Sequence, residues 1–190
     1  MSNRNLFDRR TVAFPTSLLA LLLPTCATHH ENRDCTGETF PSVTGEGLDG
    51  TIRNLPADFV GKPAVVLIGY EQRAQFDADR WLFGLLQSGT PVNLLELPTI
   101  PGLFPRLASG MIDGGMRSGI PIEEWQTVVT LYGADASTIA AFTGTDRGRN
   151  IRALLLDQQG TVVWLHDRGF SAGKLLELDG LARALLAEKD

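Results

Sequence analysis

The sequence is poor in the side chains that most often build reactive sites. Its 190 residues include only two cysteines and three histidines. So few thiols and imidazoles leave little material for a metal centre or a thiol site. Basic residues are also in the minority, because 17 Lys and Arg stand against 22 Asp and Glu, a net charge of −5. This balance argues against a nucleic-acid-binding arm and against a broad basic surface for membranes.

The remaining composition suits one folded domain. Apolar residues make up 43% of the chain and charged residues 21%, an apolar share far above that of a disordered chain. A chain of 190 residues has the length of one ordinary domain and can close over a sizeable core.

The first 25 residues have the pattern of an export signal. Arg4, Arg9 and Arg10 precede an uncharged stretch, residues 11–28, whose most apolar part is 18–23. A basic start, a short apolar run and small residues beyond it are typical of a cleavable signal peptide. The apolar run is too short to span a membrane, which needs about 20 apolar residues.

The end of this segment indicates lipid attachment. Leu23-Pro24-Thr25-Cys26 resembles a bacterial lipobox, which implies that Cys26 becomes the first mature residue and carries the lipid. We therefore expect a protein that is lipid-anchored or secreted on the periplasmic side of a bacterial membrane. An ordinary signal peptide cut nearby stays open, as does a twin-arginine signal at Arg9-Arg10. Asp8 argues against the further option, a mitochondrial presequence.

Three parts of the chain follow from these boundaries: a signal at 1–25, a flexible tether at 26–39 and a folded domain at 40–190. Without the signal the chain loses three Arg and one Asp, which leaves 14 basic and 21 acidic residues and a net charge of −7. Membrane attachment would then depend on the lipid. The tether is expected to be flexible because it is polar and has almost nothing to bury.

The pattern of the domain predicts alternating strands and helices. We expect a hairpin over 40–55, a strand buried on both faces over 64–70, and strands over 92–97 and 127–132. Helices are expected over 76–87, 103–117, 136–142 and 172–188, and a second hairpin over 151–166. In the helix over 76–87, four residues are expected to share the core face: Phe76, Leu82, Phe83 and Leu86. This order predicts an α/β fold with a central mixed sheet and helices on both faces.

Three segments carry a family resemblance. Gly61–Ile68 is similar to the opening strand of thioredoxin and peroxiredoxin domains, Leu154–Trp164 to their closing hairpin, and Gly169–Leu176 to the approach to their last helix. The domain thus resembles the thioredoxin-like superfamily, which implies a three-layer sandwich. Its C-terminal half resembles the mitochondrial ATP-synthase assembly factor of that fold, through Met116–Pro121 and the hairpin. This second resemblance implies a membrane-associated helper and carries over no catalytic residue.

The resemblance makes one absence informative. Thioredoxin-type chemistry needs a thiolate at the start of the helix after the first central strand, where the helix N-terminus lowers the thiol pKa. Residues 71–78 occupy that position and contain no cysteine. The proline usual before the closing hairpin is also replaced, by Asn150-Ile151. We therefore predict a protein without the familiar thiol chemistry, with no catalytic residue and no cofactor assigned.

Three hypotheses of function remain open. The first is a redox-inactive binding or assembly module that meets a protein partner through charges near the start of that helix: Glu71, Arg73, Asp77 and Arg80. The second is a thiol- or metal-dependent redox protein that uses Cys35 of the tether with His29 and His30. The third is an enzyme of unrelated chemistry built on Glu71, Arg73 or Asp157.

Overall fold

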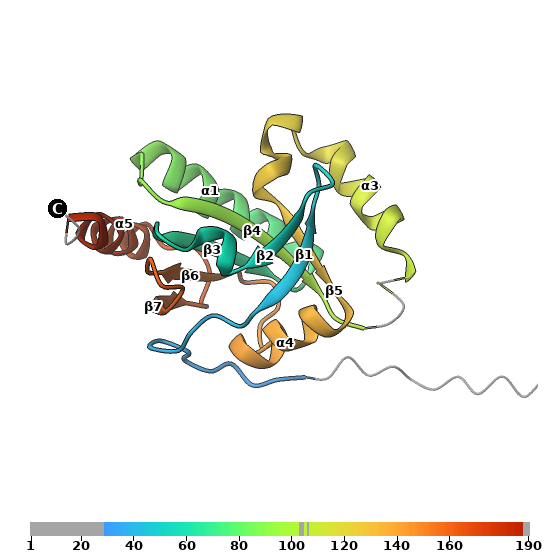
Figure 1. Ribbon diagram of the computed structural model, residues 1–190, viewed down its shortest axis with the longest axis horizontal. Helices are drawn as coiled ribbons and strands as arrows, with labels where there is room; N and C mark the ends of the chain where they lie inside the picture. Colours follow the sequence, from blue (N-terminus) through green and yellow to red (C-terminus); the bar gives the residue numbers. More distant parts are fainter. Residues whose placement is uncertain (1–28, 103–104, 106, 188–190) are drawn as a thin grey trace, which may run out of the picture.

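The computed structural model describes residues 29–102, 105 and 107–187. The predicted signal and Cys26 lie outside these residues. The described elements, in chain order, are β1 Val43–Gly47, β2 Ile52–Leu55, η1 Ala57–Phe59, β3 Ala64–Gly69, η2 Gln72–Ala74, α1 Gln75–Ser88, β4 Asn93–Ile100, α3 Ser109–Gly119, η3 Ile122–Thr127, β5 Val129–Tyr132, α4 Gly133–Thr143, β6 Arg152–Leu156, β7 Val162–His166 and α5 Ala172–Ala187 (Figure 1). Within the described chain, no helix has the length and apolar composition needed to span a bilayer.

The strands form one mixed sheet in the order β2-β1-β5-β4-β3-β6-β7. β4 pairs in parallel with both β3 and β5, whereas β6 runs antiparallel to β3 and to β7. The predicted hairpins are confirmed as β1–β2 and β6–β7. Parallel neighbours need a crossover, which α1 provides between β3 and β4, and this is why the helices lie on the faces of the sheet.

Both faces of the sheet are covered, which confirms the predicted three-layer sandwich. Val66 and Ile68 of β3 belong to the core on the α4 side, whereas Val65 and Leu67 belong to the core under α1 and α5. Figure 1 shows α4 on one side of the sheet and α1 on the other. The uninterrupted apolar run of β3 is explained by this burial on both faces.

Helix α1 turns a different face to the sheet from the one predicted. Its buried residues are Ala78, Trp81 and Leu85. Three of the residues expected in the core are instead exposed: Phe76 by 78%, Phe83 by 67% and Leu86 by 61%. The spacing of the buried three also fits one helix face, and Trp81 packs edge-on against Trp164 with ring centroids 6.0 Å apart. Contact with the β7 tryptophan therefore decides the orientation of the helix.

The predicted flexible tether is wrong for residues 29–39. Residues 29–40, called the strap below, lie along the folded domain, and Cys35 and Phe40 are buried in the core on the α4 side. The strap also pairs with the edge of the sheet, since Gly37 N donates to Val162 O at 2.7 Å and Val162 N to Glu38 O at 2.9 Å. Two buried side chains and these backbone bonds suffice to order a segment whose composition is otherwise polar.

Candidate functional site

The segment between β3 and α1 occupies the place where thiol chemistry would sit in this fold. It contains the short helix η2, whose Arg73 is exposed to solvent, as are Glu71 just before η2 and Arg80 in α1. None of these three side chains forms an ion pair with another described residue. The Glu71 side chain lies against Gly148, where an added Cβ would stand 2.5 Å from the Glu71 carboxylate. Glycine at 148 thus lets the loop before β6 approach this segment closely.

Asp77, in the first turn of α1, holds the neighbouring loops together. Its Oδ2 accepts a hydrogen bond from Ile151 N at 2.8 Å, and its Oδ1 accepts one from Phe170 N at 2.6 Å. The carboxylate therefore joins α1 to the loop before β6 and to the loop before α5. Because both oxygens are used inside the protein, the structure gives Asp77 an organising position, whereas Glu71, Arg73 and Arg80 remain open to a partner.

A buried arginine, Arg152 at the start of β6, lies against the loop that precedes this strand. The Arg152 side chain is wholly buried, and its guanidinium donates to Asn150 O at 2.9 Å, to Asn32 Oδ1 at 2.7 Å and to Asp146 O. It also lies over the Tyr70 ring, 5.1 Å from the centroid. Burial lowers the pKa of Arg152, while the nearby Tyr70 and acidic side chains oppose that shift. Nε alone of this guanidinium has no hydrogen-bond partner in the described structure.

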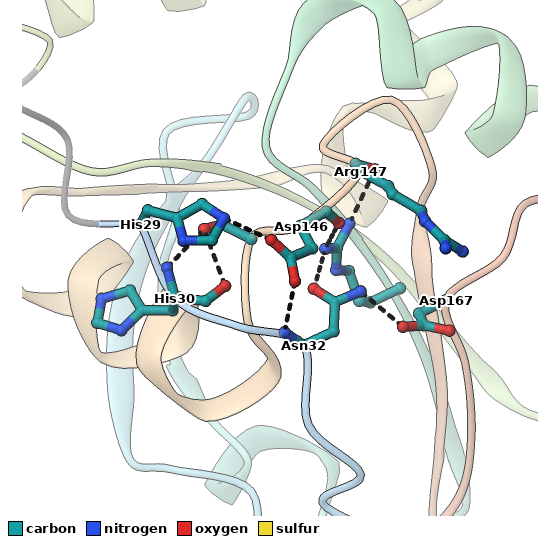
Figure 2. Close-up of polar contacts among 8 residues, drawn as sticks. His29, His30, Asn32, Asp146, Arg147 and Asp167 are labelled. Carbon is teal, nitrogen blue, oxygen red and sulfur yellow. Dashed lines mark hydrogen bonds and ion pairs between the residues drawn. The ribbon is translucent and has the colours of Figure 1, made fainter.

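The same cluster anchors the start of the strap. Asn32 donates from its Nδ2 to Asp167 Oδ2 at 2.6 Å and from its backbone N to Asp146 Oδ2 at 3.2 Å. His29 pairs with Asp146, and His30 N donates to Thr145 Oγ1 at 3.0 Å (Figure 2). Strap, loop 144–150 and the end of β7 are thus connected through side chains that the sequence pattern had placed in an unstructured tether.

Cys35 does not occupy a reactive position. It is fully buried, and burial raises its pKa from 9.0 to about 11, so that almost no thiolate exists near neutral pH. His29 is engaged by Asp146 instead. Among the described residues, no group of three His, Cys, Asp or Glu side chains is placed to hold a metal ion. These positions argue against a redox or metal site built from Cys35, His29 and His30.

Asp157 and the segment with Glu71 and Arg73 lie at opposite ends of β3 and its neighbour β6. Asp157 follows β6 at the end opposite to Arg152, and its Oδ1 accepts from Gln159 N and Thr161 N, each at 2.8 Å. Asp157 thus shapes the β6–β7 turn, and the structure does not bring together the residues named in the third hypothesis.

A polar groove of about 490 Å³ lies between the strap and the end of β7. It is lined by Asn32, Arg33, Asp34, Leu165, His166, Asp167, Arg168 and Lys174. Most of its charged groups already have partners: Arg33 pairs with Glu38, and Lys174 Nζ lies 2.6 Å from Glu177 Oε2. The groove therefore shows no excess of one charge that would select a ligand.

The exposed side of α1 forms a second surface, which sequence reasoning missed. Phe76, Phe83 and Leu86 lie on it. The short helix η3 also contacts β4, and its Ile122 is exposed by 66%. Glu96 of β4 lies between the two helices. We call these five residues, with Asp79 and Glu124, the α1–η3 face. The sequence did contain a second apolar face of α1, formed by Ala78, Trp81 and Leu85. When that face packs on the sheet, Phe76 and Phe83 are left exposed to solvent.

Comparisons with known proteins identify the fold. The sequence matches no known family profile and no curated protein. Solved structures do match. A SCO1/SenC family lipoprotein from Bacillus anthracis is 13% identical, with 80% of this chain and 99% of that chain covered and a TM-score of 0.55. BsSco, a member of the Sco family of cytochrome c oxidase assembly proteins, is 12% identical, with 80% and 98% covered and a TM-score of 0.54. The exposed lipoprotein thioredoxin of Streptococcus pneumoniae is 13% identical, with 74% and 99% covered and a TM-score of 0.51.

These matches confirm the predicted thioredoxin-like fold. Sequence identities of 12–13% show the architecture alone and transfer no site. The resemblance to the ATP-synthase assembly factor stays a prediction, as does the lipobox, which falls outside the described residues.

Proposed function

We propose that this chain of thioredoxin-like fold is a redox-inactive binding or assembly module, anchored by lipid on Cys26 at the periplasmic side of a bacterial membrane. One observation carries the proposal. The segment at the start of α1 has no cysteine, and Cys35, the one cysteine that the structure describes, is buried with its pKa raised to about 11. A fold that commonly carries thiol chemistry here presents charged side chains to solvent instead.

The structural neighbours support the location and the type of role by analogy. Two of them are described as lipoproteins, and a third belongs to a family of assembly proteins. The lipobox-like Leu23–Cys26 is consistent with that grouping. The exposed Glu71, Arg73 and Arg80 would contact the protein partner, with Asp77 holding the loops beneath them in place.

A disulfide-reduction assay tests the absence of redox chemistry. The full chain, supplied with dithiothreitol, should reduce insulin no faster than dithiothreitol alone, and Cys35→Ser should behave identically. Catalysis that is lost in Cys35→Ser would overturn the proposal and favour the thiol hypothesis.

Metabolic labelling with a palmitate analogue tests the anchor. Cells that produce the protein should yield a labelled product, and Cys26→Ala should abolish the label. Cys35→Ala is the matched control and should retain it. A label that persists in Cys26→Ala would place the lipid elsewhere.

Site-specific photo-crosslinking tests partner binding. A photoreactive residue at Arg73 should give one discrete adduct in intact cells, whereas the same residue at Lys62, an exposed position just before β3, should not. The adduct should weaken in Glu71→Ala. Identical labelling from both positions would show that no partner meets this end of the domain.

A further inference from the structure

The outward side of α1 is apolar where a solvated helix would be polar. Phe76, Phe83 and Leu86 are spaced by seven and three residues, which places them along one stripe of the helix. Each is more than 60% exposed. Scattered exposed apolar residues are ordinary, but a row of large ones on a single helix face marks an interaction surface.

The strand beside this stripe is incompletely covered. β4 has the pairing partners β3 and β5, yet its burial alternates: Leu95 and Leu97 are buried under the α4 side, while Leu94 and Glu96 are only half-buried. A strand inside a sheet with helices on both faces is usually buried on both sides. The half-buried positions show that α1 and η3 leave a strip of β4 open between them.

Three elements each bring one acidic side chain near enough to that strip to act on the others: Asp79, which accepts a hydrogen bond from Gln75 Nε2 at 3.0 Å, Glu96 and Glu124. Glu96 rises from β4, Asp79 lies on the same stripe of α1 as the phenylalanines, and Glu124 comes from η3. Burial is the main reason why the pKa of Glu96 rises to about 7, and the nearby Asp79 and Glu124 raise it further, whereas Gln75 lowers it. No described cation pairs with any of the three carboxylates.

We propose that the α1–η3 face binds a cationic amphipathic helix of the partner protein. The proposal rests on the proposed function as a binding module and adds the surface and the chemistry of the partner. Apolar residues of such a helix would cover Phe76, Phe83 and Ile122. Its Lys or Arg side chains would pair with Asp79, Glu96 and Glu124, which form no ion pair with a cation among the described residues.

The combination of features favours a peptide helix over a lipid surface. An apolar stripe flanked by matching charge is the arrangement that accepts an amphipathic helix. Arg80 is the one cation of α1, and the three carboxylates outnumber it. An anionic bilayer would therefore repel this face, and zwitterionic lipid would leave the carboxylates desolvated without a partner. Charge complementarity therefore commits the face to a basic protein segment.

A binding assay with designed peptides tests this inference on the full chain. The probe is an 18-residue helical peptide with a leucine stripe and lysines on its flanks, and the matched peptide carries glutamate in place of lysine. Fluorescence anisotropy should show at least tenfold tighter binding of the lysine peptide. Phe83→Ser and Asp79→Asn should each weaken that binding about tenfold, because a large exposed anchor or a charge partner is lost.

Leu176→Ser is the matched control, since Leu176 is a similarly exposed apolar residue on α5, and it should leave the affinity unchanged. Equal affinity for both peptides, or an equal loss in Leu176→Ser, would overturn the inference. So would binding to phosphatidylcholine vesicles that Phe83→Ser abolishes, which would assign the face to a bilayer.

The outcome is separable from that of the proposed function. If the peptide fails to bind while the Arg73 crosslink forms, the module has a partner and only this face is wrongly assigned. If the Arg73 crosslink also fails, both the module and the face lose their support.

Discussion

Replacing Glu96 by glutamine should stabilise the protein at high pH and not at low pH. Burial raises the pKa of Glu96 from 4.5 to about 7; Asp79 and Glu124 act in the same direction and the hydrogen bond with Gln75 in the opposite one. The folded state therefore holds a proton that the unfolded state releases between pH 4.5 and 7. Because the unfolded state binds fewer protons in this window, the free energy of unfolding falls as pH rises through it.

The size of the effect follows from the same values. Each unit by which folding raises the pKa of Glu96 corresponds to about 1.4 kcal/mol of unfolding free energy. The shift from 4.5 to about 7 therefore means that ionised Glu96 lowers the free energy of unfolding by at most about 3 kcal/mol above pH 7. Glu96 is only half-buried, and solvent screening reduces this figure to about 1–3 kcal/mol. Glutamine keeps the shape and the hydrogen-bonding capacity of the protonated acid without its charge.

Urea unfolding at pH 5 and pH 8 measures the difference. Glu96→Gln should gain about 1–3 kcal/mol at pH 8 and less than about 1 kcal/mol at pH 5, where the native carboxyl is largely protonated. Glu123→Gln, which removes an exposed carboxylate from η3, the short helix that carries Glu124, is the control and should show no such pH dependence. A gain of equal size at both pH values, or a loss at pH 8, would refute the reasoning.

Three further predictions concern the interior. In a Cys26→Ser chain, iodoacetamide should alkylate Cys35 at least about a hundredfold more slowly in the native state than in urea. The reason is that burial raises the thiol pKa to about 11, from 9.0 for an exposed cysteine. Comparable rates would show that the thiol is accessible. Arg152→Gln should cost about 2–4 kcal/mol in urea unfolding and speed amide exchange at Asn32, because the bonds to the strap are lost; unchanged exchange there would contradict the anchoring. Asp77→Ala should cost about 2–4 kcal/mol, since Ile151 N and Phe170 N lose their acceptor, and Asp77→Asn should cost less; equal losses would argue against these bonds.

Much of the architecture was predictable from local pattern. The apolar run of β3, the turn between β6 and β7 and the spacing in α5 each depend on neighbouring residues, so their secondary structure could be inferred without knowing what they contact. The missing cysteine at the start of α1 was visible in the same way, because that position is defined by the strand before it.

The orientation of α1 was not predictable, because two helix faces competed. Phe76, Phe83 and Leu86 are more apolar than the face that contains Ala78, yet Ala78 lets the helix lie close to the sheet and Trp81 finds Trp164 there. Packing against β7, more than eighty residues away in sequence, decided between them. The consequence is a candidate binding surface that hydrophobicity alone had assigned to the core.

The sequence by itself determined the fold class, the order of the elements and the absence of a thiol where this fold commonly uses one. Only the tertiary structure decided whether the polar segment before β1 is ordered. Such a segment is ordered when its polar groups find partners, and here those partners lie far away in the sequence. Asn32 meets Arg152 and Asp167, and Cys35 enters the core, so a segment with the composition of a tether becomes part of the domain.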